Sequence, residues 1–174
     1  ADLLRGSIDA GEYKSYIFPL LFLKRLSDVY DEETNRALVE SSGDKAYASR
    51  PEQHRFVLSK KAHWSKLVST PKDIGSAIMA AMRDVERSNP RLESIFGDAA
   101  WTNKNRLRDS TLKDLLSHFS MLTLSLETVP EDEMGFAYEY LIKKFADDSG
   151  HTAAEFYTNR TVVHLMSQML DIEP

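Results

Sequence analysis

Residues 16–28 read Tyr-Ile-Phe-Pro-Leu-Leu-Phe-Leu-Lys-Arg-Leu-Ser-Asp, and they contain the longest dense apolar run of the 174-residue chain. In the surrounding segment, residues 9–41, apolar side chains fall on two neighbouring stripes of a helix. The stripes are formed by Tyr13, Tyr16, Ile17, Leu20 and Leu21, and by Phe18, Phe22, Leu26 and Val29. A helix that is apolar over more than half of its circumference is buried on several sides. We therefore expect the rest of the chain to pack around this helix.

The same helix carries signals for its start and for a break. Asp9 can cap the start, and Glu12 three residues later completes a pattern that is like a capping box. Pro19 lacks a backbone donor, so it should kink or interrupt the helix.

Two adjacent cations follow the apolar run. Lys24 lies one helical turn before Asp28, and this spacing favours an ion pair between the two side chains. The alternative is that Lys24 and Arg25 face nucleic acid.

Further helices are predicted wherever apolar residues recur at helical spacing. We expect helices over residues 62–68, from Pro71 to about residue 88, from Asp109 or Ser110 to about residue 119, and from about residue 130 to 150. In the last of these the apolar stripe is formed by Met134, Ala137, Tyr138, Leu141, Ile142 and Phe145. Tyr138 and Leu141 should therefore be buried. Residues 41–55 are predicted as a loop or short helix, and residues 56–58 could form a short strand.

These elements indicate the fold class. The chain is expected to be mainly α, a helical bundle-like domain with a kinked long N-terminal helix and room for one short β element. No glycine- or proline-rich linker divides it before about residue 150.

Composition narrows the class of protein. Hydrophobic residues make up 42% of the chain and charged residues 28%, which is typical of a globular domain. Cysteine is absent, so no disulfide or cysteine-based metal site can form. The longest apolar run is far shorter than the ~18 residues that span a bilayer, and we expect a cytoplasmic protein without a membrane segment. The five histidines are scattered singly, and we predict no metal site.

Charge is distributed unevenly along the chain. The net charge is −5, but residues 50–66 and 101–113 are basic, and residues 127–148 are acidic. Lys60, Lys61, Arg106 and Arg108 are therefore our candidates for contacts to a DNA backbone. The alternative is that these side chains contact only solvent or a partner protein.

A second motif lies near the end of the chain. Residues 153–160 read Ala-Ala-Glu-Phe-Tyr-Thr-Asn-Arg, and an apolar helical pattern follows. Thr158 or Asn159 can cap that helix, whose start would suit an anionic group. Taken alone, the pattern favours an ordinary capped helix packed by two aromatic side chains.

Glu155-Phe156-Tyr157-Thr158 before an apolar helix resembles the S-adenosylmethionine-binding motif of N6-adenine methylases. In particular it is similar to the methylase (M, HsdM) subunit of type I restriction–modification systems, where the stretch usually reads Gly-Glu-Phe-Tyr-Thr-Pro-Arg. Here Asn159 stands in place of the proline, and alanines precede the motif where glycine is common. Residues 16–28 and 135–141 resemble the same family.

The resemblance implies a division into a helical N-terminal domain, residues 1–150, and a junction, residues 151–174, that leads into a catalytic domain. It also implies one wall of an S-adenosylmethionine pocket. The residues that match the motif positions of this wall are Glu155, Phe156, Tyr157, Thr158, Asn159 and Arg160.

The resemblance further implies the partners: a specificity subunit, a restriction subunit, a second M subunit and double-stranded DNA. The role implied for this domain is subunit assembly and closure around DNA during adenine N6 methylation. The glycine-rich cofactor loop and the Asn-Pro-Pro-aromatic tetrad of the family are absent from these 174 residues. We therefore assign no catalytic residue and expect no methyl transfer by this chain alone, although the full-length parent would be an enzyme. The alternatives are a stand-alone helical DNA-binding or adaptor protein, and a small enzyme of an unrecognised type.

Overall fold

The computed structural model describes residues 2–149 and 160–170, and these residues form helices joined by turns. The α-helices are α1 (Tyr13–Glu40), α2 (Lys45–Ala48), α3 (Trp64–Val68), α4 (Ile74–Ser88), α5 (Asp109–Ser120), α6 (Glu131–Ser149) and α7 (Arg160–Met169). Four 3-10 turns, η1 (Asp2–Leu4), η2 (Ala10–Glu12), η3 (Pro51–Gln53) and η4 (Pro90–Leu92), complete the set. Within the described ranges the only β pairing is an isolated bridge between Arg5 and Ile8. The predicted mainly α class is confirmed.

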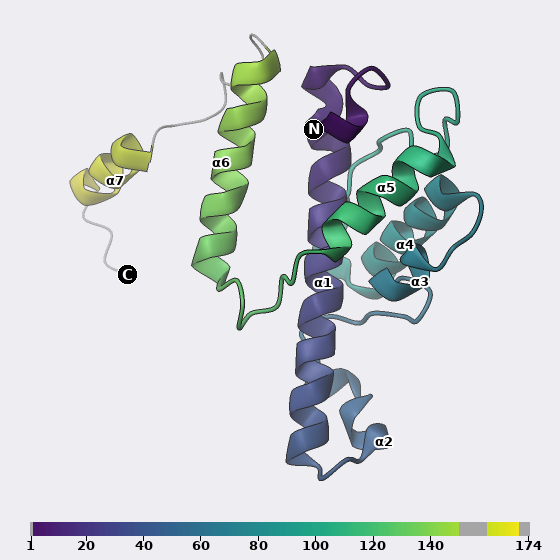
Figure 1. Cartoon of the computed structure of the whole chain (residues 1–174). Coiled ribbons are helices and arrows are strands. Elements are labelled where there is room, and N and C mark those ends of the chain that lie inside the picture. Colours follow the sequence, from purple (N-terminus) through teal and green to yellow (C-terminus); the bar gives the residue numbers. More distant parts are fainter. Residues whose placement is uncertain (1, 150–159, 171–174) are drawn as a thin grey trace.

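α1 is the central element of the fold (Figure 1). Helices α3, α4 and α5 gather on one side of its N-terminal half, and α6 runs alongside the other side in the opposite direction. α2 lies against the C-terminal end of α1. This arrangement confirms that the helix of the opening stretch is surrounded by the rest of the chain.

The buried face of α1 is the predicted one. Leu20 and Leu23 have no exposed surface, and the first predicted stripe is buried throughout. The ring of Tyr16 meets Trp101 edge to face at a centroid distance of 5.0 Å. Aromatic pairs in this geometry are favourable beyond the area that they bury.

α1 begins and continues differently from the prediction. Residues 10–12 form η2, and the helix proper starts at Tyr13 after Glu12, whose side chain makes no cap. Asp9 contributes its backbone carbonyl, which accepts from the Glu12 amide at 2.9 Å. The helix runs through Pro19 without interruption, so the proline costs one backbone bond but does not end the helix.

The suggested strand at residues 56–58 does not form. The side chain of Asn89 hydrogen-bonds to the backbone of Val57 instead. Its Oδ1 accepts from the Val57 amide at 2.8 Å, and its Nδ2 donates to the Val57 carbonyl at 2.9 Å. An amide side chain presents a donor and an acceptor side by side, as a neighbouring strand would. Val57 therefore needs no strand partner.

α4 starts later than predicted, whereas α5 starts at Asp109 as predicted. α4 begins at Ile74, three residues after Pro71, and its first turn is capped from another helix. The carboxylate of Asp109 accepts from the amides of Asp73 at 2.9 Å and Ile74 at 3.2 Å. The sequence predicts that Asp109 or Ser110 caps α5, but both residues lie in the first turn of α5, and Asp109 caps α4. The contact joins the starts of the two helices.

The predicted burial of Tyr138 is wrong, and that of Leu141 is only partly met. Tyr138 is 48% exposed and Leu141 is partly buried, although Phe145 on the same stripe is 5% exposed. The face of α6 predicted to point inward is nevertheless the correct one, because the Tyr138 ring packs on the ring of Phe18 in α1, with 4.7 Å between the ring centroids. α6 is covered by α1 and η2 along one side, so the edges of its stripe remain open to solvent.

Candidate functional site

The predicted cofactor motif falls at the edge of the described residues. Glu155, Phe156, Tyr157, Thr158 and Asn159 lie outside them, and so does any cap that Thr158 or Asn159 would make. The apolar segment that follows does form a helix, α7, which begins at Arg160. The exposed large side chains of α7 are Val162, Val163, Leu165, Met166 and Met169.

Of the four side chains predicted to contact DNA, one forms an ion pair and three make none within the described residues. Arg106 forms an ion pair with Glu12 of η2, and this hydrogen bond raises the pKa of Arg106. Lys60, Lys61 and Arg108 are exposed and make no ion pair within the described residues. Arg106 therefore already has a structural partner, whereas the other three remain available.

The two basic segments lie at opposite ends of α4. Ser59, next to Lys60, donates to Asp84 near the end of α4 at 2.5 Å, and Lys104 pairs with Asp73 just before its start. Asp84 lies eleven positions after Asp73, which corresponds to about 16 Å along a helix. Lys60 and Arg106 are consequently placed apart and do not form one cluster.

Lys61 shares a cleft with Lys66 of its own basic segment and with Arg87, a cation of α4 that the sequence did not group with them. This cleft of about 360 Å³ lies between α3 and α4. Asp84 is the acid of this cleft, and it already accepts from Ser59 and from Arg87, the latter at 3.3 Å. The edge of the cleft is thus a basic surface.

The most extensive polar contacts join α1 to the connector, residues 121–130, between α5 and α6. Arg25 donates from Nη1 to the carbonyls of Leu124 and Ser125, both at 2.6 Å. Asp28 accepts from the Leu124 amide at 2.7 Å. Glu32 accepts from the Leu126 amide at 2.6 Å and, more weakly, from that of Glu127 at 3.4 Å. We call Arg25, Asp28 and Glu32 the α1 latch.

The neighbours of the latch hold it in position. Lys24 forms the predicted ion pair with Asp28, which confirms that interpretation over a contact to nucleic acid. Arg25 is only 8% exposed; burial lowers the pKa of its guanidinium, while the charge of Glu32 acts in the opposite direction. Ser27, between them in sequence, accepts from the Trp64 amide at 3.0 Å. The polar residues of the opening stretch, within residues 24–28, therefore make contacts that stabilise the fold.

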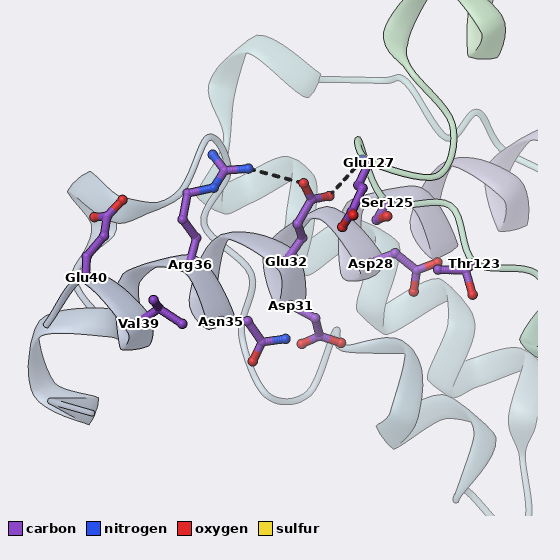
Figure 2. A pocket seen from close by; sticks show the side chains of 10 residues that line it. All are labelled: Asp28, Asp31, Glu32, Asn35, Arg36, Val39, Glu40, Thr123, Ser125 and Glu127. Carbon is purple, nitrogen blue, oxygen red and sulfur yellow. Dashed lines mark hydrogen bonds and ion pairs between the residues drawn. The ribbon is translucent and has the colours of Figure 1, made fainter. Parts of the chain in front are cut away.

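A groove of about 800 Å³ lies beside the latch (Figure 2). It is lined by α1 from Asp28 to Glu40 and by Thr123, Ser125 and Glu127 of the connector. Several of its acids already have partners: Glu32 accepts from Arg36 at 3.2 Å, and Asp31 lies 2.9 Å from Nε2 of His63. In the part of the chain that the structure describes, no group of three histidine or carboxylate side chains could hold a metal ion.

Sequence reasoning missed the latch as a unit. The available signal was its spacing, since Arg25, Asp28 and Glu32 recur every three or four residues on a helix that is otherwise buried. Charged side chains on a buried helix need partners, because an unpaired buried charge is costly. What the pattern could not identify was the partner, a backbone segment about 100 residues away.

None of the described helices is long and apolar enough to cross a membrane.

Two family models match the chain, one after the other along the sequence. The HsdM N-terminal domain matches residues 1–119, and the N-6 DNA Methylase family matches residues 129–174. The first match ends in α5 and the second begins just before α6. The connector held by the latch therefore lies between them.

Curated relatives carry related names. The type I restriction enzyme MjaIX methylase subunit of Methanocaldococcus jannaschii is 25% identical over 192 residues, which cover 99% of this chain and 34% of the relative. The MpnII methylase subunit of Mycoplasma pneumoniae is 23% identical, covering 97% and 37%. The HindI methylase subunit of Haemophilus influenzae is 29% identical over 109 residues, covering 61% and 24%. The chain thus spans about a third of the length of the first two relatives.

Proposed function

The chain belongs to the HsdM N-terminal domain family, and from this premise we propose that it is the N-terminal part of a type I restriction–modification methylase subunit. The complete subunit would transfer a methyl group from S-adenosylmethionine to N6 of adenine in double-stranded DNA. The observation that carries the proposal is the order of the two family matches on one chain, with a structured connector between them. The N-6 DNA Methylase match over residues 129–174 favours this interpretation over a stand-alone adaptor protein.

The helical domain would act in assembly and in closure around DNA. Its partners would be the specificity and restriction subunits and a second methylase subunit, as the family resemblance implies; the relatives are named as methylase subunits of type I restriction enzymes. Lys60, Lys61 and Arg108 are the side chains best available for phosphates, and Arg106 would have to leave Glu12 to take part. A subunit that modifies DNA in this way would work in the cytoplasm.

Residues 155–160 would form one wall of the S-adenosylmethionine pocket. Support comes from α7, which starts at Arg160, the last residue of the motif, because unpaired amides at a helix start favour an anionic group such as the cofactor carboxylate. The cofactor would supply the methyl group, and this chain would contribute binding contacts. A pocket normally surrounds most of its ligand, so we expect the isolated chain to bind S-adenosylmethionine very weakly in calorimetry. The division of the chain near residue 150 stays a prediction.

The proposal is tested with the complete gene product. We expect the reading frame to continue into a glycine-rich loop and an Asn-Pro-Pro-aromatic tetrad. The complete subunit, purified with its specificity subunit, should transfer labelled methyl groups from S-adenosylmethionine to adenine in duplex DNA. Absence of both sequence motifs, or transfer to another base, would contradict the proposal.

A further inference from the structure

We infer that Arg25, Asp28 and Glu32, the α1 latch, are positioning residues for the proposed methylase: they fix the start of α6, and thereby the segment that leads to the cofactor motif, relative to the helical domain. The inference rests on the proposed function. It goes beyond it by giving a role in the reaction to side chains that lie far along the sequence from the motif.

The contacts of the latch are directional. A guanidinium donates to two consecutive carbonyls, and two carboxylates accept from amides on either side of them. Charge-assisted hydrogen bonds of this kind are shorter and stronger than neutral ones. Three side chains of α1 thus hold four backbone groups of residues 124–126. The latch therefore holds the connector at a fixed distance from α1.

Packing alone does not hold the start of α6. A cavity of about 200 Å³ lies between α1, Phe56 and the first turn of α6, bordered by Leu126 and Met134. The ion pair between Arg55 and Glu131 joins the same region, but both side chains are more than half exposed. Exposed ion pairs contribute little to stability. The polar contacts of the latch thus add a directional restraint to the packing of Val129 and Met134 at this end of the helix.

The other half of α6 is held by aromatic contacts. Phe145 is buried and meets Phe18 edge to face at 5.9 Å, and Tyr138 contacts the same ring. A helix restrained at two points keeps its direction. Release of the latch would leave α6 held mainly along the rest of its length, by the Phe18 contacts and by η2, so its start could move relative to α1. The connector lies between the two family matches, so the position of this start would set how the methylase part meets the helical domain.

The test uses the complete methylase subunit assembled with its specificity subunit. The variants are Arg25→Lys, which keeps the charge but removes the planar guanidinium whose Nη1 donates to two carbonyls, and Glu32→Gln, which weakens the bonds to the Leu126 and Glu127 amides. Arg36→Ala is the matched control, because Arg36 is an exposed partner of Glu32 that does not touch the connector. Hydrogen exchange reports the connector and α6, and initial rates of methyl transfer report kcat and the KM for DNA.

Both latch variants should speed amide exchange at Leu124 and Leu126 by about fivefold or more, and along the first turns of α6. They should lower kcat by about tenfold or more, since small misplacements of reacting groups are costly, and leave the KM for DNA within about twofold. The control Arg36→Ala should change neither the exchange rates nor kcat. Denaturant titrations at the assay temperature check that each variant is folded.

Faster exchange with an unchanged kcat would overturn the inference, because the latch would then serve only the fold. Unchanged exchange in both variants would overturn it too, since the latch would not restrain the connector. If Arg25→Lys fails to fold, Glu32→Gln decides alone. If the unmodified complex transfers no methyl group, the proposed function fails instead, and exchange along α6 still decides whether the latch fixes that helix.

Discussion

Gly75 is the residue whose identity the packing dictates most directly. A Cβ atom at this position in α4 would lie 2.0 Å from the backbone oxygen of Trp101. Alanine normally stabilises a helix by about 1 kcal/mol relative to glycine. Here the carbonyl would have to move, and overpacking of this kind costs about 1–3 kcal/mol. We expect Gly75→Ala to lower the free energy of unfolding in urea.

Gly135 in α6 provides the matched control. Nothing lies within 4 Å of a Cβ built there. Gly135→Ala should therefore show the ordinary helix effect and raise the free energy of unfolding by about 0.5–1 kcal/mol. Changes of the same sign in both variants would mean that the close approach of Trp101 does not control residue 75.

Asp73 gives a prediction for pH. Its hydrogen bond with Lys104, and next the charge of Lys104, hold the pKa of the Asp73 carboxyl below its ordinary value; Lys72 adds a smaller effect in the same direction. The unfolded chain binds a proton at Asp73 more readily, so the contribution of the pair to stability is present at neutral pH. It is lost as the pH falls through the folded-state pKa.

An NMR titration of the Asp73 carboxyl measures this effect. Lys104→Ala should raise the pKa of Asp73 towards its ordinary value, and Lys72→Ala should raise it less. Equal shifts from the two variants would indicate a general charge effect in place of the specific pair.

At the scale of helices, apolar periodicity predicted which segments form and tertiary contacts decided where they begin. The buried first stripe of α1 and the presence of helices α4 and α5 were predicted correctly, because they depend on spacing within one segment. The start of α4 was predicted wrongly, because the carboxylate that caps it comes from Asp109 in α5. The suggested strand at residues 56–58 failed for the same reason, since Asn89 is a partner that the local sequence does not reveal.

α6 shows how burial varies along one correctly predicted stripe. Phe145→Ala should cost about 3–5 kcal/mol, because a buried aromatic ring is removed. Tyr138→Ala should cost only about 0.5–1.5 kcal/mol, the value of an aromatic pair, since half of the side chain is already exposed. Urea denaturation of the two variants measures the difference. A larger loss for Tyr138→Ala would mean that α6 is covered from a side on which the structure leaves it open.

At the scale of the whole molecule, motif and composition indicated the class of protein but not the arrangement of its charges. Residues 155–160 could be matched to a family because a binding motif is local. The latch could not be foreseen, because Arg25 and Leu124 meet only when α1, α5 and the connector are in place. The basic segments were expected to share a role, but whether they share a surface depends on α4, which separates Lys60 from Arg106.

This separation leads to a prediction for DNA binding by the assembled enzyme. The chain has a net charge of −5, so DNA contacts must come from local surfaces. Lys60 and Lys61 make no ion pair within the described residues, and they lie at the cleft of α3 and α4. Binding to phosphate releases counterions and does not depend on the base sequence. Lys60→Ala with Lys61→Ala should lower affinity equally for specific and random duplexes. The slope of log affinity against log salt should become shallower by about 1 for each phosphate that the variant no longer binds.

The control removes a cation that already has a partner. Glu12→Gln with Arg106→Gln eliminates one ion pair without changing the net charge, so the salt slope should stay the same. A shallower slope in this variant would place Arg106 on the phosphate backbone after all, with Glu12 as a partner only in the absence of DNA. If the double lysine variant keeps both affinity and slope, Lys60 and Lys61 face the specificity subunit or solvent. The two salt slopes together therefore show whether the cations near each end of α4 contact DNA.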